Sequence, residues 1–252
     1  MSIEFLTFLR RETHRFLVLY KQTIIPALIS SLLYIIVFGT TLGTRISSIN
    51  GIPYINYIIP GLAMMSVINQ AYQNSASSIM QGKYLKFIED ILIAPLSGFE
   101  ISLGYIISGA LRGLICGMGI LIICLFITDL EIQKITLTIF YLLTVSWTFS
   151  AFGVIVGIYA TSWDEIGTFT NFVFMPLTFL GGVFYSVDML PPLWRNISYI
   201  NPIYWMISGL RYSTLGLEEN ANLISLFICF GFSCIFTLIA TWMFKTGYKI
   251  KS

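Results

Sequence analysis

Residues 101–128 read ISLGYIISGALRGLICGMGILIICLFIT, and Arg112 is their only charged residue. A helix needs about 20 apolar residues to cross the ~30 Å hydrocarbon core of a membrane. This stretch is long enough, so the sequence predicts that it spans a membrane.

The composition of the whole chain agrees with this interpretation. The 252 residues include 14 Lys+Arg and 12 Asp+Glu, so 10% are charged, against about 25% in soluble domains. Hydrophobic residues make up 56% of the chain and the mean hydropathy is +0.83, which leaves too few polar groups to cover a soluble globule. A soluble enzyme is therefore excluded, and the net charge of +2 is too small to indicate nucleic-acid binding.

Five further uncharged stretches are long enough to cross, at residues 24–42, 56–80, 135–159, 166–187 and 223–244. A seventh apolar stretch, residues 203–217, contains Arg211 and is only about 15 residues long, which favours a re-entrant or interfacial segment. The predicted fold class is an all-α integral membrane protein with six transmembrane helices, forming one domain over residues 1–252.

Basic residues divide unevenly between the two sides of these spans. Nine fall on one side and four on the other: Arg10, Arg11, Arg15, Lys21, Lys83, Lys86, Lys245, Lys249 and Lys251 against Arg45, Lys134, Arg195 and Arg211. Cytoplasmic loops carry the excess of Lys and Arg. We therefore expect a multi-pass protein of the bacterial cytoplasmic (inner) membrane with both termini in the cytoplasm.

Two amphipathic segments are expected on that side. In residues 1–21 one helical face carries the apolar residues Leu6, Leu9, Phe16, Leu17 and Tyr20. This pattern is typical of a helix that lies in the headgroup plane. Such a helix is either a simple anchor or a contact surface for a partner. Residues 81–96 contain five apolar side chains at the spacing i, i+3, i+4, i+7 and i+8, namely Tyr84, Phe87, Ile88, Ile91 and Leu92. This spacing predicts a short surface helix, which Pro95 ends.

Two S-x-x-E patterns precede predicted spans, at residues 97–100 and 162–165. They are typical of capping boxes, which satisfy the first free amides of a helix. Capping accounts for Glu100 and Glu165. It does not account for Asp164, which is a candidate partner contact.

The stretch at residues 101–128 has two further features. Gly109, Gly113 and Gly117 form a ladder at four-residue spacing, which lets helices approach closely in lipid; the sequence leaves open whether they pack within or between subunits. Arg112 lies near mid-membrane, where an arginine costs at least ~2.5 kcal/mol unless it faces protein or water. It is therefore either satisfied structurally or in contact with a substrate pathway.

The connection at residues 188–217 is expected on the outside. It is rich in aromatic residues of the kind that settle at headgroup level, and prolines divide it into two short helices. Backbone that enters a membrane and turns back is tolerated only against protein or a water-filled cavity. We therefore expect an external re-entrant helical hairpin that forms a gate or a dimer seam.

Several motifs occur in order along the chain: IEDILIAPL at 88–96, PLTFLGGVFY at 176–185, LPP at 190–192, NP at 201–202 and GLRY at 209–212. Over nearly the whole chain this set resembles the ABC-2 type permease family, most closely its YadH-like bacterial branch. The resemblance implies that two copies of a six-span subunit form a channel, while two separate nucleotide-binding ATPase subunits hydrolyse ATP.

On this resemblance the chain is expected to be the permease subunit of an ATP-driven exporter of lipid-linked, polysaccharide or hydrophobic cargo. It would not itself be an enzyme, because the G-x-x-x-x-G-K-[ST] loop that binds ATP phosphates is absent from the sequence. ATP and Mg²⁺ are expected in the partner subunit, and no cofactor and no catalytic residue in this chain. A metal site is not expected either, since His14 is the only histidine and the four cysteines lie in apolar runs.

Two groups of residues are the candidate sites. Coupling to the ATPase is assigned to the segment at residues 81–96 and the loop before the fifth span, namely to Tyr84, Phe87, Ile88, Ile91, Leu92 and Asp164. The substrate pathway or dimer interface is assigned to Arg112, Tyr204, Trp205, Arg211 and Tyr212.

Two alternative functions stay open. One is a secondary transporter driven by an ion gradient, or a channel. Ion-driven carriers usually place carboxylates within their spans and often show repeated halves, and neither is present in this sequence. The other is a membrane assembly factor without transport activity, which the composition does not exclude.

Overall fold

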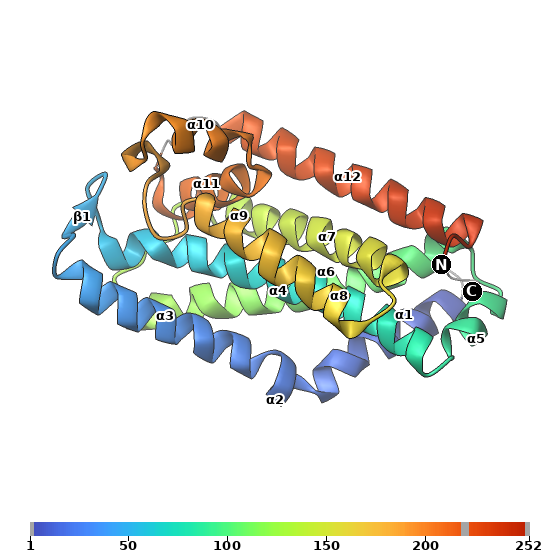
Figure 1. Cartoon of the computed structure of the whole chain (residues 1–252). Coiled ribbons are helices and arrows are strands. Elements are labelled where there is room, and N and C mark those ends of the chain that lie inside the picture. Colours follow the sequence, from blue (N-terminus) through green and yellow to red (C-terminus); the bar gives the residue numbers. More distant parts are fainter. Residues whose placement is uncertain (1–2, 218–221, 250–252) are drawn as a thin grey trace.

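The computed structural model describes residues 3–217 and 222–249 as an elongated bundle of helices with one short β-hairpin (Figure 1). The first half contains α1 (Ile3–Val18), α2 (Tyr20–Thr23), α3 (Ile25–Gly43), β1 (Ser48–Ile49), β2 (Ile52–Pro53), α4 (Tyr54–Tyr84), α5 (Ile88–Ile93) and α6 (Gly98–Ile127). The second half contains α7 (Ile135–Tyr159), α8 (Trp163–Thr168), the π-helical turn η1 (Phe169–Phe174), α9 (Met175–Leu180), the 3₁₀ turn η2 (Val187–Met189), α10 (Pro192–Ile200), α11 (Pro202–Leu215) and α12 (Asn222–Thr246). The strands pair antiparallel, with Ile49 opposite Ile52.

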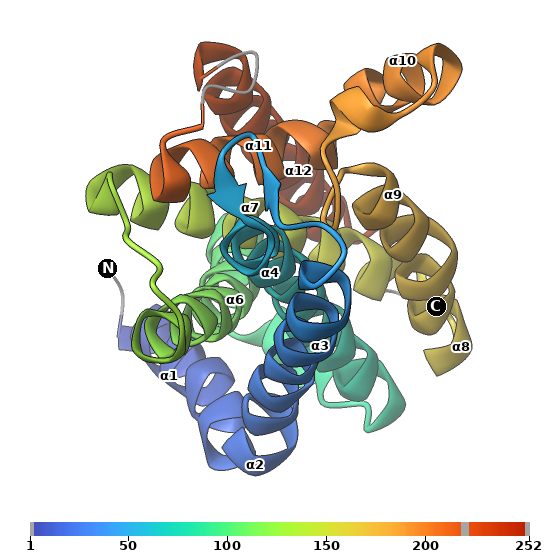
Figure 2. The ribbon, with the colours of Figure 1, turned by 90° about the vertical axis from the view of Figure 1, so that its left-hand side faces the viewer.

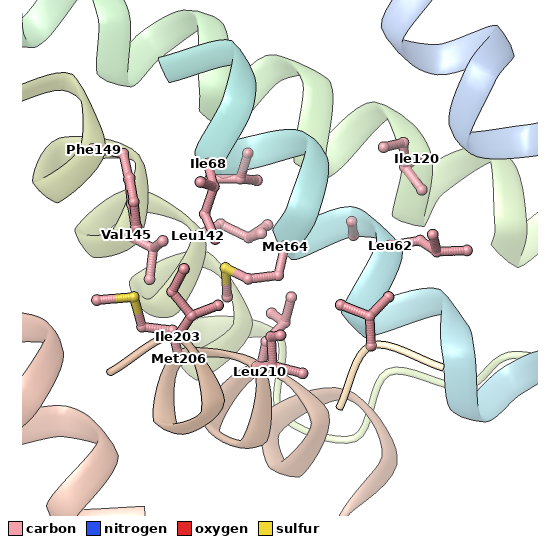
Figure 3. Close-up of a cluster of buried hydrophobic side chains, with 14 of the residues drawn as sticks. Leu62, Met64, Ile68, Ile120, Leu142, Val145, Phe149, Ile203, Met206 and Leu210 are labelled. Carbon is pink, nitrogen blue, oxygen red and sulfur yellow. The ribbon is translucent and has the colours of Figure 1, made fainter. Parts of the chain in front are cut away.

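The 31-residue helix α4 is the centre of the bundle, with α3, α6, α7 and α11 around it (Figure 2). Apolar side chains of α4, α6, α7 and α11 interdigitate in one core (Figure 3), which includes Leu62, Met64, Ile68, Ile120, Leu142, Val145, Phe149, Ile203, Met206 and Leu210. The short α11 is therefore part of this core.

The glycine ladder of α6 packs inside the subunit. A Cβ at Gly109 would lie 2.3 Å from the Ser75 hydroxyl of α4, and one at Gly113 would lie 2.3 Å from the Ser146 hydroxyl of α7. Gly153 of α7 similarly faces the Tyr72 carbonyl of α4, at 2.5 Å from a Cβ. Because no side chain fits at these positions, the backbones of α4, α6 and α7 approach closely.

Among the described residues, four helical segments are long and apolar enough to cross a membrane: Tyr20–Gly43, Gly98–Ile127, Ile135–Tyr159 and Leu223–Thr246. They correspond to the first, third, fourth and sixth predicted spans. The second lies in α4, which is long but carries many polar side chains. The fifth is divided into α8, η1 and α9, with Pro176 in the first turn of α9. An all-α membrane fold is confirmed, whereas the count of six crossings stays a prediction.

Elements distant in sequence gather at the two ends of the bundle. At one end lie α1, α5, the start of α6 and the end of α12 (Figure 1), where a Cβ at Gly98 would meet the backbone of Lys245 at 2.8 Å. At the other end lie the β-hairpin and α10. We call the first the α1–α5 end.

Candidate functional site

The segment predicted as one surface helix contains a break. Helix α4 continues to Tyr84, and α5 begins only at Ile88. Between them, Lys86 adopts a left-handed backbone with φ of 61°. Tyr84 is 76% exposed at the end of α4, while Ile88 and Ile91 of α5 are 4% and 5% exposed. The sequence pattern suggested a continuous stripe because no glycine or proline marks the break.

The apolar face of α5 therefore packs on the chain itself. Ile88 and Ile91 belong to a second core with Phe8 of α1, Tyr105 of α6 and Phe244 of α12, against which Phe87 and Leu92 also pack. The outward side of α5 carries Glu89, Asp90 and Ile93, which are exposed. These residues and Tyr84, rather than Ile88 and Ile91, are available to a partner.

Helices α1 and α5 border a groove of about 470 Å³. It is lined by Ile3, Glu4, Thr7, Phe8, Arg11, Asp90, Ile91, Ala94, Pro95 and Leu96. Its floor is apolar and its rim carries both signs of charge. A groove of this kind suits a protein segment with an apolar anchor and charged flanks.

Helix α1 is held by a face that matches the predicted one only at Phe16. Its buried residues are Phe5, Phe8, Glu12 and Phe16, whereas Leu6 and Leu17 of the predicted apolar face are 50% and 44% exposed. The sequence analysis followed hydrophobic periodicity alone and so missed a buried carboxylate.

Glu12 is 1% exposed and forms a charged network at the junction of α1 with α4. Its carboxylate pairs with Arg11 at 2.7 Å and with Arg15 at 3.7 Å, and accepts a hydrogen bond from Ser78 at 2.5 Å. Arg15 donates to the Asn74 carbonyl oxygen at 2.9 Å. These bonds connect the α1–α5 end directly to the central helix.

Helix α4 carries a polar face in its second half. Its partly accessible positions include Asn69, Gln73, Ser77 and Gln81, which recur every four residues and so share one helical face. We call these four residues the α4 stripe. Gln73 donates to the Thr170 hydroxyl of η1 at 3.1 Å. Helices α3, α8 and α9 lie near α4 (Figure 2). Asn69 lines a cavity with residues of α3, so this part of the stripe lies between α3 and η1.

A cavity of about 130 Å³ lies beside the stripe, between α3 and α4. Its lining contains three serines and two amides, Ser30, Ser31, Ser66, Asn69 and Gln70. The buried Ser66 hydroxyl and Asn69 carbonyl oxygen have no hydrogen-bond partner within the described parts of the chain. Polar atoms at membrane depth are costly unless they meet water or a ligand, so this region is suited to a hydrophilic path.

Arg112 borders the same region. Its guanidinium donates to the Gln70 side-chain carbonyl of α4 and to the Thr23 backbone carbonyl at the break between α2 and α3, at 3.4 Å. These contacts provide the structural partners that an arginine at this depth requires. They place Arg112 beside Gln70 and the cavity. The external hairpin, which contains the other residues predicted for the substrate pathway or dimer interface, provides neither contact.

The predicted external segment contains the two expected short helices, α10 and α11. With 14 residues, α11 is about 21 Å long and so too short to cross a membrane. Tyr204 packs 5.1 Å from Trp205 between ring centroids, and the Trp205 indole donates to the Tyr199 carbonyl at 2.8 Å. Tyr212 lies two turns further on, where Lys134 contacts its hydroxyl. The three predicted aromatic residues therefore do not form one cluster.

Arg211 is 2% exposed and fastens α11 to the core. It donates to the Gly182 carbonyl at 2.8 Å, and its guanidinium lies 3.9 Å from the centroid of the Tyr57 ring. Gly182 has a φ of +77°, a backbone conformation that favours glycine. Arg211 thus joins the turn after α9, the central helix and α11.

Helix α8 contains the remaining predicted coupling residue. Asp164 is exposed in the first turn of α8. Ser162 caps this helix by accepting from the Glu165 amide at 3.3 Å, but the Glu165 carboxylate turns to the amide and hydroxyl of Thr161. These two hydrogen bonds lower the pKa of Glu165. The box at residues 97–100 is complete, with the Ser97 and Glu100 side chains each bonded to the other's amide.

The sequence of the chain is similar to known transport proteins of one family. The profile of a family described as ABC-2 type transporter matches residues 3–215. The chain is 38% identical to the inner membrane transport permease YadH of Escherichia coli K12, over 96% of this chain and 94% of that protein. It is 23% identical to nodulation protein J of Rhizobium leguminosarum bv. viciae, over 86% and 83% of the two chains, and 22% identical to nodulation protein J of Rhizobium meliloti, over 77% and 74%.

Proposed function

The chain belongs to the ABC-2 type transporter family, and we propose that it is the membrane-spanning subunit of an ATP-driven exporter. Separate ATPase subunits bind and hydrolyse ATP with Mg²⁺, and a second copy of this chain completes the channel. The protein lies in the bacterial cytoplasmic membrane with the α1–α5 end, and therefore both termini, on the cytoplasmic side. That end holds most of the basic residues, as expected for a cytoplasmic face.

One observation carries the proposal: the α1–α5 end is hydrogen-bonded to the central helix α4, which carries the polar stripe. The groove between α1 and α5 is a docking surface for a soluble partner. Glu12 and Arg15 link α1 to Ser78 and Asn74 of α4. The α4 stripe is on the same helix. A displacement of α1 or α5 by a partner is thereby transmitted to the residues that line the path.

The ATPase contacts the exposed side of this end. Tyr84, Asp90 and Ile93 are exposed, and Asp164 is exposed in the first turn of α8. Phe87, Ile88, Ile91 and Leu92 contribute by holding α5 against α1, α6 and α12. The docking surface of the partner is therefore expected to combine an apolar pocket for Ile93 with basic groups facing Asp90 and Asp164.

The path for cargo runs along the α4 stripe. Helix α3 buries little of its own surface, and the segment from α8 to α9 exposes apolar side chains such as Phe172 at 77%. These two flanks are the surfaces that the second copy covers. An uncharged polar stripe between apolar flanks suits an amphiphilic cargo, in agreement with a lipid-linked, polysaccharide or hydrophobic substrate. The external hairpin, with Arg211, closes the outer end of the path.

The test is co-purification and coupled ATPase activity. The affinity-tagged full chain is purified from its native membranes, and the ATPase that accompanies it is quantified and assayed in vesicles. The double variant Asp90→Arg/Ile93→Asp changes two exposed residues of α5 and is expected to lose at least ten-fold of the bound ATPase.

The matched control, Glu131→Arg/Met189→Asp, changes two exposed residues at the opposite end of the bundle. It carries the same type of charge change and is expected to retain the ATPase. Full retention by the α5 variant, or equal loss by both variants, contradicts docking at the α1–α5 end. Purification without any ATPase contradicts the proposed function itself.

A further inference from the structure

A second cavity at the α1–α5 end lies on the other side of α5 from the groove. It has a volume of about 490 Å³, within the range of small-molecule sites. Four separate segments form it: the end of α4, the start of α5, the residues after α7 and the residues after α12. It is lined by Met80, Lys83, Tyr84, Lys86, Ile88, Glu89, Tyr159, Ala160, Thr161 and Lys249.

Three lysines and a single glutamate make this lining positive. Lys83 donates to the carbonyls of Ile158 and Ala160 at the end of α7, the latter at 3.1 Å. The ammonium of Lys249 lies 3.7 Å from the centroid of the Tyr159 ring. Within the described residues none of these three lysines forms an ion pair, and Glu165 attracts Lys83 only from a greater distance.

The positive charges act on one another. Burial and repulsion from Lys249 lower the pKa of Lys83 to about 8, against the attraction of Glu165. Lys86 and Lys249 both adopt left-handed backbone, with φ of 61° and 53°, which is uncommon for residues other than glycine. An anion between the three ammonium groups relieves this repulsion.

The cavity is bordered by the ends of three long helices. Helices α4, α7 and α12 all end beside it, at Tyr84, Tyr159 and Thr246. Tyr84, Tyr159 and Tyr248 are 76%, 52% and 46% exposed near these helix ends. Exposed aromatic residues at helix ends are typical of the boundary between hydrocarbon and water, and basic pockets between helices at this boundary bind anionic headgroups.

We propose that this cavity binds the phosphate-bearing headgroup of an anionic lipid. Lys86 and Lys249 contact the phosphate from opposite walls, while Lys83 is fixed by the end of α7. The hydroxyls of Tyr84 and Thr161 provide further donors within the lining. The bound lipid thereby connects the turn between α4 and α5 to the end of the chain. This site is distinct from the docking groove, which lies between α1 and α5.

The test uses the delipidated full chain in detergent and measures lipid retention by native mass spectrometry. Phosphatidylglycerol is titrated as the anionic lipid and phosphatidylcholine as the lipid without net charge. The variant Lys86→Gln/Lys249→Gln leaves Lys83 and its hydrogen bonds intact. It is expected to weaken binding of phosphatidylglycerol about 30-fold, with little effect on phosphatidylcholine.

The control Lys21→Gln/Lys245→Gln removes the same charge from exposed residues outside the cavity lining and is expected to bind as the unchanged protein does. Equal binding by the two variants overturns the site. A parallel titration with inorganic phosphate separates the two sources of the phosphate group. Failure of millimolar phosphate to displace phosphatidylglycerol supports a lipid site, whereas full displacement identifies a site for a free anion and overturns the lipid assignment.

Discussion

Substitution of Glu12 by Gln tests whether the buried network holds α1 in place. The change removes the negative charge and keeps the volume of the side chain. In the structure this carboxylate is 1% exposed and pairs with Arg11 at 2.7 Å. It also accepts from Ser78 at 2.5 Å. The variant leaves the neighbouring arginines without their counter-charge, so α1 is expected to bind less firmly to α4.

The size of the effect follows from the exposure of the partners. Breaking a fully buried ion pair costs about 3–5 kcal/mol, and a hydrogen bond to a charged group contributes about 1.5–3 kcal/mol. The side chain of Arg11 is 48% exposed and that of Arg15 is 24% exposed, so water replaces part of what is lost. We expect a loss of about 2–3 kcal/mol in the free energy of unfolding.

Equilibrium unfolding in mixed micelles of dodecyl maltoside and SDS measures this loss. Glu4→Gln, on the exposed side of the same helix, is the matched control. A double-mutant cycle of Glu12→Gln with Ser78→Ala separates their interaction from other effects. A loss of less than about 0.5 kcal/mol, equal to that of the control, refutes the network as a support of α1. So does full additivity in the cycle.

Three other predictions concern packing, the hairpin and pH. Gly113→Leu is expected to abolish a monodisperse peak in size-exclusion chromatography, because even a Cβ at this position lies 2.3 Å from the Ser146 hydroxyl. Gly231→Leu is the control, because a Cβ at Gly231 has open space around it. Equal elution profiles of the two variants would contradict close packing at Gly113. Arg211→Met is expected to lower stability by about 1–3 kcal/mol in thermal unfolding, because the Gly182 carbonyl loses its donor; no decrease would exclude this role. Burial lowers the pKa of Lys83 to about 8 from 10.5, so the unfolded chain binds more protons between these pH values, and stability is expected to rise with pH in this window. Lys83→Gln removes that increment, and an unchanged pH slope would contradict the shifted pKa.

The membrane fold was largely predictable because it depends on length and hydropathy. The stretch at residues 101–128 lies in α6, and the capping box at residues 97–100 formed as its pattern indicated, whereas at residues 162–165 only the serine half formed. The sequence left open where the glycine ladder packs, and the structure places it against α4 and α7. Spacing alone cannot identify the partner of a helix face, because that depends on which helices become neighbours.

The candidate site was less predictable, because its residues break the patterns used to find it. Lys86 interrupts the expected surface helix with a left-handed backbone that lysine does not signal. Arg11 and Arg15 neighbour Glu12 on the same helix, but Ser78 reaches it only in the folded chain, so the sequence pattern did not mark Glu12 as buried. The α4 stripe consists of polar residues within a helix that was read only as a span. The available signal was that a polar residue recurs at every fourth position from Asn69 to Gln81.

The close approach of α4, α6 and α7 has a mechanical consequence. Where hydroxyls and carbonyls fill the space of missing side chains, three helices can neither slide nor separate without losing contact along their whole length. They form a stiff unit, while α3 buries only Ser31 and Ile35 and the segment beyond α8 contains a π-helical turn. The structure therefore combines a stiff unit of α4, α6 and α7 with two less firmly packed flanks, which are α3 and the segment from α8 to α9.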